Sequence, residues 1–413
     1  MSFQQGLSGL NAAAKNLDVI GNNVANSNTT GFKQSVANFG DVFAASLGGG
    51  DGAQVGIGTT LASVAQQFSQ GNITVTNNPL DVAINGKGFF RMSDNGAITF
   101  TRNGQFAVDK TGYIVDSGGQ NLTGFQAIKG KIVPGVLVDL QMSTADLPPT
   151  STVKVTVGAN LAATDSVLLP AGFLPTDPTT FNFSTATSVI DSLGQSHTAT
   201  MYFNKSAVDL VTKVSSWVVN VYVDGAAANN LGVTTLNFDA AGKLITLGAS
   251  APNNLVKKAV LTNGATDMTV TMDYGQMTQF GSGFGVNTLE QDGFGAGQLS
   301  GYSIGADGII LGRYTNGQTD TLGQVALANF SNSQGLKPLG ESKWGESASS
   351  GAALIGSPGS ASLGALQSAA REDSNVDLTA ELVNMITAQR IYQANAQSIK
   401  TQDAVLQTLV NLK

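Results

Sequence analysis

Apolar residues recur with coiled-coil spacing at both ends of this 413-residue chain, and no other feature limits the possible folds as strongly. Near the start, steps of four and three residues connect Phe3, Leu7, Leu10, Ala14, Leu17 and Val24, with Ile20 beside a weak position at Gly21. Near the end the same spacing, with polar interruptions, connects Leu378, Leu382, Met385, Tyr392, Ile399, Leu406 and Val410. We therefore expect a helix at each end, with an apolar seam along it.

The limits of these two helices can be predicted from local signals. Ser374 to Asp377 is a capping sequence, in which the serine oxygen accepts a free backbone N–H and the carboxylate suits the positive helix end. Gly21, Asn22 and Asn23 should end the first helix, because glycine tolerates positive φ and asparagine bonds its own backbone. The run through Thr30, Gly31 and Phe32 should then turn the chain outward, with Phe32 either anchored on a neighbour or in an ordinary local contact.

The first helix contains Gly6, Gly9 and Gly21, so it should be marginal as an isolated helix. Helices of this kind stay frayed until their seams are buried. We expect both ends to become ordered against neighbouring subunits. The alternative is that the two helices form a hairpin that packs on the chain's own body, which would use the same seam positions.

Between the helices, turn signals replace helical periodicity. Asn-Gly pairs such as 95/96 and 316/317 lie beside short runs with apolar residues two apart, as at Leu80, Val82 and Ile84. The predicted fold class is therefore a mainly β body of hairpin-rich, sandwich-like or barrel-like sheets. Terminal α-helices form a coiled-coil core domain beside it.

The predicted domains are nested, because the hairpin pattern of residues 72–144 resumes at 281–339. We expect a helical core domain of 1–28 plus 372–413, an inner β domain of 72–144 plus 281–339, and an inserted outer β domain of 145–280. The remaining 29–71 plus 340–371 should form an extended connecting region, because its Gly and Ser side chains cannot fill a large core.

Composition excludes several classes of function. Charged residues make up only 12% of the chain and the net charge is −7, so a nucleic-acid partner is not expected. There is no cysteine, which removes disulfides and thiolate metal sites. Neither a cleavable signal peptide nor a long apolar stretch is present, so we expect no membrane insertion.

No catalytic, cofactor-binding or metal-binding residue can be assigned. His197 is the single histidine, and Ser196 beside it in a strand would point to the opposite face, so we expect a hydrogen-bonded surface or edge histidine. The glycines of 281–285 and 293–297, and Gly86-Lys87, do not complete a nucleotide-binding motif. Glu290 and Asp292 do not define a glycosidase pair.

Three long segments resemble the bacterial flagellar rod and hook family. They are LSGLNAAAKNLDVIGNNVANSNTTGFK at 7–33, NPLDVAINGKGFF at 78–90, and NVDLTAELVNMITAQRIYQANAQSIKTQDAVLQTLVNLK at 375–413. Within this family, the length, the inserted block and ANFSNSQGLKPLGESKW at 328–344 favour a subunit of the hook over the much shorter distal rod subunit.

The resemblance implies a non-enzymatic subunit that assembles with itself into a hollow, flexible tube, the hook. This tube transmits torque from rod to filament as a universal joint, with the terminal helices on the inside. Further implied partners are the hook cap, the distal rod, the hook–filament junction proteins and the flagellar export apparatus, which delivers the chain outside the cell without a cleaved signal. A secreted β-rich adhesin or glycan-binding protein, or a glycan-cleaving enzyme, remains an alternative from the residues alone.

Overall fold

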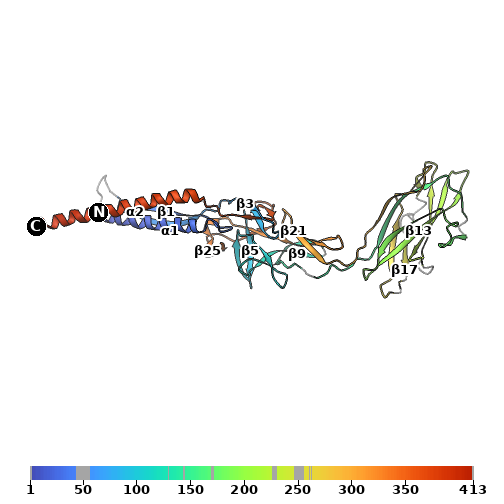
Figure 1. Cartoon of the computed structure of the whole chain (residues 1–413), viewed down its shortest axis with the longest axis horizontal. Helices are drawn as coiled ribbons and strands as arrows, with labels where there is room; N and C mark the ends of the chain where they lie inside the picture. Colours follow the sequence, from blue (N-terminus) through green and yellow to red (C-terminus); the bar gives the residue numbers. More distant parts are fainter. Residues whose placement is uncertain are drawn as a thin grey trace. The chain divides into compact units, whose positions relative to one another are not determined.

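The computed structural model describes residues 2–42, 56–128, 130–142, 145–168, 172–225, 230–245, 255–259, 261 and 263–411. The chain divides into two compact units, both visible in Figure 1. The inner unit comprises Met1–Thr144, Gly301–Arg313 and Thr319–Lys413, and the outer unit comprises Ala145–Ser300 and Tyr314–Gln318. Strands form the body of both units, and α-helices stand at the two ends of the chain, which confirms the predicted fold class.

The terminal helices α1 (Ser2–Ala25) and α2 (Leu378–Asn411) run antiparallel, side by side in Figure 1. The two helices pack closely at Gly9, where an added Cβ would lie 2.8 Å from the side-chain oxygen of Asn395. Glycine lowers the helix propensity of α1, but here it also lets the second helix pack closely. Asn23 lies by Glu381 and Gly6 by Ile399, so the last turns of α2 extend past the start of α1.

The residue that ends α1 and the residue that caps α2 both differ from the predicted ones. α1 does not end at Gly21 but continues to Ala25, because Gly21 keeps a helical conformation and Asn26 N–H still donates to the carbonyl of Asn22 at 3.1 Å. The cap of α2 is Asp377 rather than Ser374. Its Oδ1 accepts from the N–H groups of Thr379 and Ala380 at 2.9 and 3.1 Å, which satisfies two free donors of the first turn.

The predicted connecting region is not simply extended. Its first part contains an antiparallel hairpin of β1 (Ser35–Val42) and β2 (Gly58–Gln66), which packs along α1. Its second part contributes β26 (Lys343–Gly345), β27 (Leu354–Gly356), β28 (Ala365–Ser368) and β29 (Ala370–Glu372), which pair with strands of the body, as β28 does with β4 (Val82–Asn85). Small side chains cannot fill a core, yet their backbones can still complete sheets. Much of LGGGDGAQVGIGTT at 47–60 lies outside the described residues.

The main sheet of the inner unit has the order β21-β22-β23-β9-β5-β6-β26-β25, with further strands paired at its sides. Two short pairs, β28 with β4 and β29 with β3, adjoin it. The remaining bounds in this unit are β3 Ile73–Val75, β4 Val82–Asn85, β5 Phe89–Asp94, β6 Ala97–Thr101, β7 Ala107–Val108, β8 Ile114–Val115, β9 Asn121–Ile128, β10 Lys131–Asp139, β21 Leu299–Ile304, β22 Ile309–Tyr314, β23 Thr319–Val325, β24 Leu327–Asn329, the 3-10 turn Ser333–Gly335, β25 Lys337–Gly340, β26 Lys343–Gly345, β27 Leu354–Gly356, β28 Ala365–Ser368 and β29 Ala370–Glu372.

Aromatic side chains connect the β1–β2 hairpin to this inner sheet. Phe89, Phe330 and Trp344 belong to a buried cluster. Phe68, just after β2, packs edge-on against it, with 5.6 Å between the ring centroids of Phe68 and Phe89. The Trp344 indole N–H also donates to the side-chain oxygen of Gln66 at 2.6 Å. The hairpin is therefore anchored at its base by both apolar contact and a hydrogen bond.

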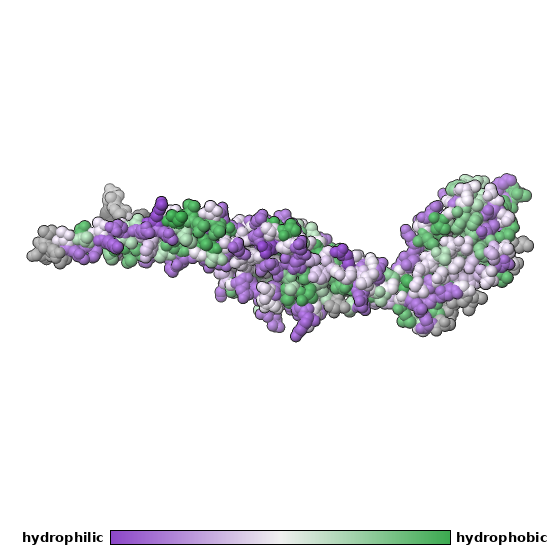
Figure 2. All heavy atoms as spheres, in the orientation of Figure 1, coloured by the Kyte–Doolittle hydropathy of each residue, from purple (hydrophilic) through white to green (hydrophobic). Residues whose placement is uncertain are grey.

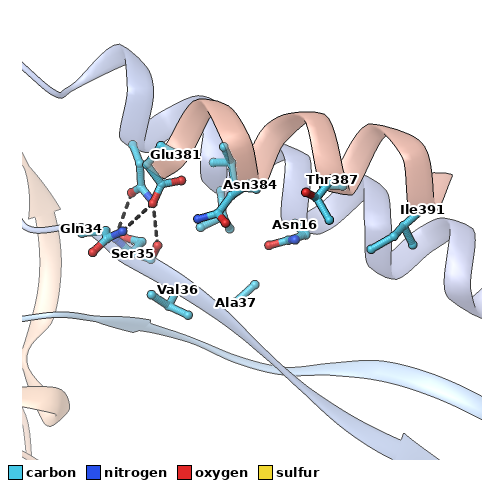
Figure 3. Close-up of a pocket in the computed structure, with 13 residues that line it drawn as sticks. Asn16, Gln34, Ser35, Val36, Ala37, Glu381, Asn384, Thr387 and Ile391 are labelled. Atoms are coloured by element: carbon cyan, nitrogen blue, oxygen red, sulfur yellow. Dashed lines mark hydrogen bonds between the residues drawn. The ribbon is translucent and has the colours of Figure 1, made fainter. Parts of the chain in front are cut away.

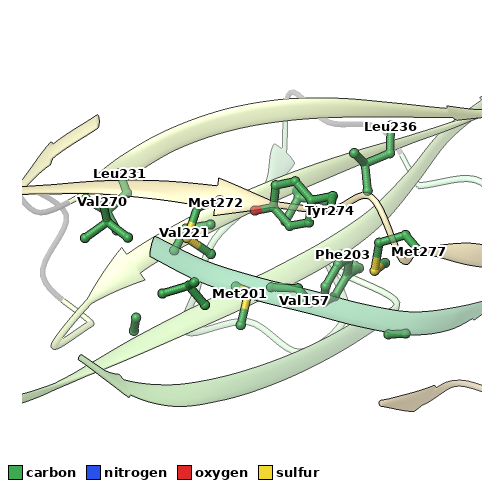
Figure 4. Packing of buried hydrophobic residues seen from close by; sticks show 14 of the residues in the cluster. Val157, Met201, Phe203, Val221, Leu231, Leu236, Val270, Met272, Tyr274 and Met277 are labelled. Atoms are coloured by element: carbon green, nitrogen blue, oxygen red, sulfur yellow. The ribbon is translucent and has the colours of Figure 1, made fainter. Parts of the chain in front are cut away.

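The outer unit contains two five-stranded sheets around one apolar core (Figure 4). One sheet is the antiparallel series β12 to β16, and the other has the order β17-β18-β11-β19 with β20 beside β11. The bounds are β11 Lys154–Ala162, β12 Phe183–Ile190, β13 Ser196–Val208, β14 Ser215–Val223, β15 Asn230–Phe238, β16 Leu244–Ile245, β17 Leu255–Ala259, β18 Met268–Asp273, β19 Thr278–Phe280 and β20 Gly285–Gln291.

The end of this outer unit differs from the predicted boundary at residue 280. Residues 281–300 belong to it because β20 pairs antiparallel with β11, from Val155 opposite Gln291 to Asn160 opposite Gly285. The short segment Tyr314–Gln318 also belongs to this unit. A repeated hairpin style in the sequence does not show which sheet a strand joins.

Candidate assembly site

Large apolar side chains remain exposed on both terminal helices in the single chain. Figure 2 shows hydrophobic surface over this part of the inner unit. Of the residues expected to form the helix seams, six are exposed: Phe3, Leu7, Leu378, Leu382, Tyr392 and Leu406. Leu10, Leu17, Val24, Met385 and Ile399 are partly buried, Ile20 is buried, and the side chain of Val410 lies outside the described residues.

The face of α2 that lies toward α1 carries more polar and smaller side chains than the apolar seam of the same helix. Glu381 and Ala388 are its buried residues, and Asn395 and Ile399 contact the glycines of α1. Leu378, Leu382 and Leu406 consequently point elsewhere and stay about half exposed, Leu406 at 49%. Contact within the chain therefore uses only part of the apolar surface that the sequence provides.

A pocket of about 240 Å³ opens between the two helices and β1 (Figure 3). Its apolar walls include Ile20, Val36 and Ile391, and its polar residues include Asn16, Gln34, Asn384 and Glu381. Figure 3 places Asn384 and Thr387 along the side of α2 that borders this space.

Asn23 joins the end of α1 to the beginning of β1 at one end of this pocket. Its Nδ2 donates to the carbonyl of Ser35 at 2.8 Å, and its Oδ1 accepts from the N–H of Ser35 at 2.9 Å. The side-chain amide thus pairs with Ser35 as a neighbouring strand would. Glu381 Oε1 lies 3.5 Å from the same Asn23 amide and accepts a short hydrogen bond from Gln34 Nε2.

A buried ion cluster lies where both helices meet the β body. Lys33 Nζ is 2.6 Å from Glu372 Oε1, and Arg102 Nη1 is 3.1 Å from Glu372 Oε2. All three side chains are almost fully buried. The cluster joins the segment after α1, a loop of the inner sheet and the segment before α2, so it fixes where both helices leave the body.

Backbone groups complete this cluster. Lys33 Nζ donates to the carbonyl of Ser69 at 2.7 Å, Arg102 Nη2 donates to that of Gly86 at 2.8 Å, and the N–H of Gly71 donates to Glu372 Oε1 at 2.9 Å. Burial lowers the pKa of Lys33 against the opposing effect of Glu372, and it lowers the pKa of Arg102 in the same way. Glu372 is therefore the group that makes two buried cations tolerable here.

The residues of the predicted connecting turn fall partly in α1 and partly in the segment that joins α1 to β1. Gly21 and Asn22 belong to α1, and Asn23 is buried at the junction with β1. Thr30 is partly buried and lines a second pocket of about 330 Å³, while Phe32 lines a third of about 280 Å³ that also contains Trp344. Gly31 has φ of +71°, and its N–H donates to the Glu372 carbonyl at 2.8 Å.

The residues considered above for catalysis make hydrogen bonds that hold the fold together. His197 lies in β13, an interior strand, and is 9% exposed, so it is not an edge histidine. Its Nδ1 is 2.7 Å from Asp224 and its Nε2 is 3.2 Å from Asp191, while Ser196 bonds Ser188. Asp292 accepts backbone N–H groups of Val153 and Lys154.

The described residues contain neither a cluster of metal-binding side chains nor a membrane-spanning helix. No group of three or more His, Asp or Glu side chains in this part of the chain could hold a metal ion. Neither α1 nor α2, nor any other helix in the described ranges, is both long and apolar enough to cross a membrane.

Sequence reasoning found the helices but missed the buried polar groups between them and the body. Glu372 lies 339 residues after Lys33 and 270 residues after Arg102, and no local pattern predicts their contact. A weak signal existed in Arg371-Glu372-Asp373, a rare cluster of charges in a chain with 12% charged residues.

Comparison with known proteins identifies the class of this chain. Four family models match it: "Flagella basal body rod protein" at 3–33, "Flagellar hook protein FlgE/F/G D1 domain" at 83–160, "Flagellar basal body protein FlaE D2 domain" at 160–294 and "Flagellar basal body rod FlgEFG protein C-terminal" at 367–412. A helix pair joined to nested β domains is thus the arrangement of an axial protein of the bacterial flagellum.

Full-length relatives narrow the class. The chain is 40% identical to the flagellar hook protein FlgE of Escherichia coli strain K12, with 100% of both chains covered. It is 32% identical to the flagellar hook protein FlgE of Borreliella burgdorferi, covering 100% of this chain and 99% of that one. The crystal structure of the Helicobacter pylori flagellar hook protein FlgE2 shares the fold, with a TM-score of 0.54, 14% identity, and 71% of this chain and 99% of that chain covered.

The chain belongs to the flagellar hook protein family, and it is a structural subunit of the flagellar hook. The alternatives of a distal rod subunit and of a glycan-binding adhesin are not favoured by these relatives. The family is a structural one, and it places the chain in the hook of the flagellum.

Proposed function

We propose that copies of this chain assemble through their terminal helices into the hollow, flexible tube of the hook, which transmits torque as a universal joint. The observation that carries this proposal is the apolar surface left open on α1 and α2. Leu7, Leu382 and Leu406 are each between 44% and 49% exposed, although they occupy positions of the predicted seams.

Burial of this surface gives assembly its driving force. Each leucine or isoleucine side chain taken fully out of water contributes roughly 1.5 to 3 kcal/mol, and half of that is available at a half-exposed position. Phe3, Leu378, Val383, Ile386, Ile391 and Val405 add to the residues named above. A head-to-tail contact that does not close into a ring propagates as an open helix, so one kind of subunit can form the tube.

The β units have a different role in this proposal. They form the outer layers of the tube, around the helical core. A chain with only 12% charged residues and 50 glycines presents small polar contacts that slide at low cost when the tube bends.

The remaining parts of the proposal concern delivery and neighbours. Export proceeds through the flagellar export apparatus without a cleaved signal, and the cap, distal rod and hook–filament junction proteins contact the ends of the tube. The chain carries out no catalysis and needs no cofactor.

A truncation that spares the buried ion cluster tests the assembly. Full-length protein and a chain of residues 26–377 are incubated under polymerising salt and compared by electron microscopy and sedimentation. This truncation keeps Lys33, Arg102 and Glu372, so the β units should stay folded. Tubes from the full chain and monomers from the truncated chain are expected.

Two controls make the result decisive. Circular dichroism of the truncated chain must retain the β signal, which shows that loss of tubes is not loss of folding. A double variant, Leu382→Ser and Leu406→Ser, should also lower polymer yield while leaving the monomer intact, because both side chains are exposed in it. Tubes formed by the truncated chain would contradict the proposal.

A further inference from the structure

The carboxylate of Glu381 is buried but only half satisfied. The residue is 3% exposed, and Oε1 accepts from Gln34 Nε2. Oε2 has no hydrogen-bond partner among the described residues. Leaving such an acceptor unpaired away from water is costly, and a charged one more so, which favours a donor from outside the chain.

The surroundings of this carboxylate provide further acceptors. Asn16, Gln34 and Asn384 line the same pocket, and within the described part of the chain no hydrogen bond reaches their side-chain oxygens. Figure 3 shows Asn384 and Asn16 to the right of Glu381, beside the space that separates α2 from Val36 and Ala37 of β1. One carboxylate oxygen and three amide oxygens suit a cation with many donors. A lysine has three donors, whereas the planar guanidinium of arginine has five.

One arginine is available for this role. The chain has five arginines, at 91, 102, 313, 371 and 390. Arg91 bonds Thr123, Arg102 pairs with Glu372, Arg371 pairs with Asp373, and Arg313 is also engaged. Arg390 is exposed on α2 and makes no hydrogen bond or ion pair with the described residues.

Arg390 cannot serve the Glu381 of its own chain. It lies nine residues further along α2, which is about two and a half turns and about 13.5 Å. The two side chains therefore point from opposite sides of the helix. An acceptor on one face and its donor on the other make a head-to-tail contact, which repeats from copy to copy without closing.

We propose that the guanidinium of Arg390 from a second copy of this chain enters the pocket between α1, α2 and β1 and pairs with Glu381. This inference rests on the proposed self-assembly and names the residue contact that orders neighbouring helices. The amide oxygens of Asn16, Gln34 and Asn384 accept the remaining donors of the guanidinium. The contact is made only in the polymer, so the monomer holds Glu381 ready for it.

A double-mutant cycle on polymerisation tests the pairing. The critical concentration is measured by sedimentation for wild type, Glu381→Gln, Arg390→Gln and the double variant. Loss of one partner of a buried charge pair should raise the critical concentration by about 30-fold or more. The double variant should be no worse than either single variant, because the same contact is lost in all three. Additive effects would overturn the pairing.

Two further variants isolate the chemistry. Lys400→Gln removes another exposed cation of α2 and should change the critical concentration by less than about 3-fold. Arg390→Lys keeps the positive charge but loses the planar guanidinium with its paired donors. Its critical concentration should therefore lie between those of wild type and Arg390→Gln. A large effect of Lys400→Gln with none of Arg390→Gln would overturn the assignment of Arg390.

Monomer stability separates this role from an ordinary folding role of Glu381. Because its Oε2 is unpaired within the chain, Glu381→Gln should leave the denaturation midpoint of the monomer unchanged or raised. A strongly lowered midpoint together with normal polymerisation of Arg390→Gln would overturn the inference. If wild type forms no polymer, the proposed function itself fails, which is a distinct result.

Cross-linking gives direct evidence of proximity. The chain has no cysteine, so Asn384→Cys and Gln393→Cys, the latter an exposed position one turn from Arg390, can be made singly and mixed in equal amounts while Arg390 is kept. A short bis-maleimide should link them in polymers but not in monomers. The mixture of Asn384→Cys with Lys400→Cys is the control. Stronger linking in that control than in the test mixture would contradict the proposed contact.

Discussion

The outer unit and the terminal helix pair differ in how they hide apolar surface. In the outer unit, Trp217, Phe203 and Phe238 are fully buried inside two sheets (Figure 4 shows this core). In the helix pair, Ala13, Ile20 and Ala388 are the buried apolar residues, and larger side chains stay exposed. The outer unit buries its large hydrophobic side chains within a single chain, and the helix pair leaves many of them exposed.

This difference fits a chain that contains both a self-contained module and, as proposed above, an element that becomes covered on assembly. A core closed by two sheets needs no partner and should unfold cooperatively by itself. An open apolar stripe on two helices gains stability only when another surface covers it. The following substitutions test whether the two regions respond independently.

The largest effect is expected in the closed core of the outer unit. Phe203→Ala should lower the free energy of unfolding of this unit by about 3 to 5 kcal/mol, because a buried ring is lost and a cavity remains. In a Trp344→Phe background, Trp217 is the remaining tryptophan, so its fluorescence reports urea unfolding of the outer unit. Polymer formation by folded protein should be retained; its loss would show that the two regions are coupled.

A similar loss is expected in the inner unit when the ion cluster is broken. Glu372→Gln leaves Lys33 and Arg102 buried without a countercharge, which costs about 3 to 5 kcal/mol. The neighbouring Asp373→Asn is the matched control, because its pair with Arg371 is partly exposed to solvent and contributes at most about 1 kcal/mol. Near-UV circular dichroism of Trp344, in a Trp217→Phe background, measures both. Equal effects of the two substitutions would contradict the role of the cluster.

A smaller effect distinguishes two glycines near the end of α1. Gly31→Ala should destabilise the inner unit by about 1 to 3 kcal/mol, since φ is +71° and the new Cβ would lie 2.6 Å from the backbone nitrogen of Asn103. Gly21→Ala should stabilise it by about 0.5 to 1 kcal/mol, because Gly21 is helical and no atom lies within 4 Å of an added Cβ. Opposite signs in thermal unfolding are the expected result.

The smallest effect is the pH dependence of the outer unit through His197. Burial disfavours the charged ring, but hydrogen bonds to Asp224 and Asp191 outweigh it and raise the pKa of His197. A raised pKa in the folded state stabilises the unit below about pH 6.5, and this contribution is lost as pH rises through the folded pKa. The slope is at most about 1.4 kcal/mol per pH unit, because one proton is released. His197→Gln should remove this slope in urea titrations at several pH values.

Asp191 makes the stability of the outer unit depend on pH in the acid range as well, and we call this part of the stability curve its acid limb. Burial opposes its ionisation, yet hydrogen bonds from Asn263, Gln195 and His197 lower its pKa to about 2. A lowered pKa gives stability that is present above about pH 3.8 and is lost as pH falls toward 2. Asp191→Asn should therefore flatten the acid limb; an unchanged limb would assign it to other carboxylates.

The sequence predicted the fold class and the two helices because those depend on periodicity. It did not predict that Gly9 would permit close packing, that Asp377 would cap α2, or that 281–300 would join the outer unit. These outcomes depend on which segments meet in three dimensions. The buried polar groups were beyond local reasoning for the same reason: Asn23, Glu381 and Glu372 acquire their roles from residues far away along the chain.

The ion cluster of Lys33, Arg102 and Glu372 also has a consequence for the order of folding. Its carboxylate comes from the last tenth of the chain, 339 residues after the lysine it neutralises. Until that segment arrives, two cations would have to enter a dry interior alone, so the inner sheet cannot close around an incomplete polypeptide. If the chain is exported as proposed above, its inner sheet therefore closes only after nearly all of the chain has left the export channel.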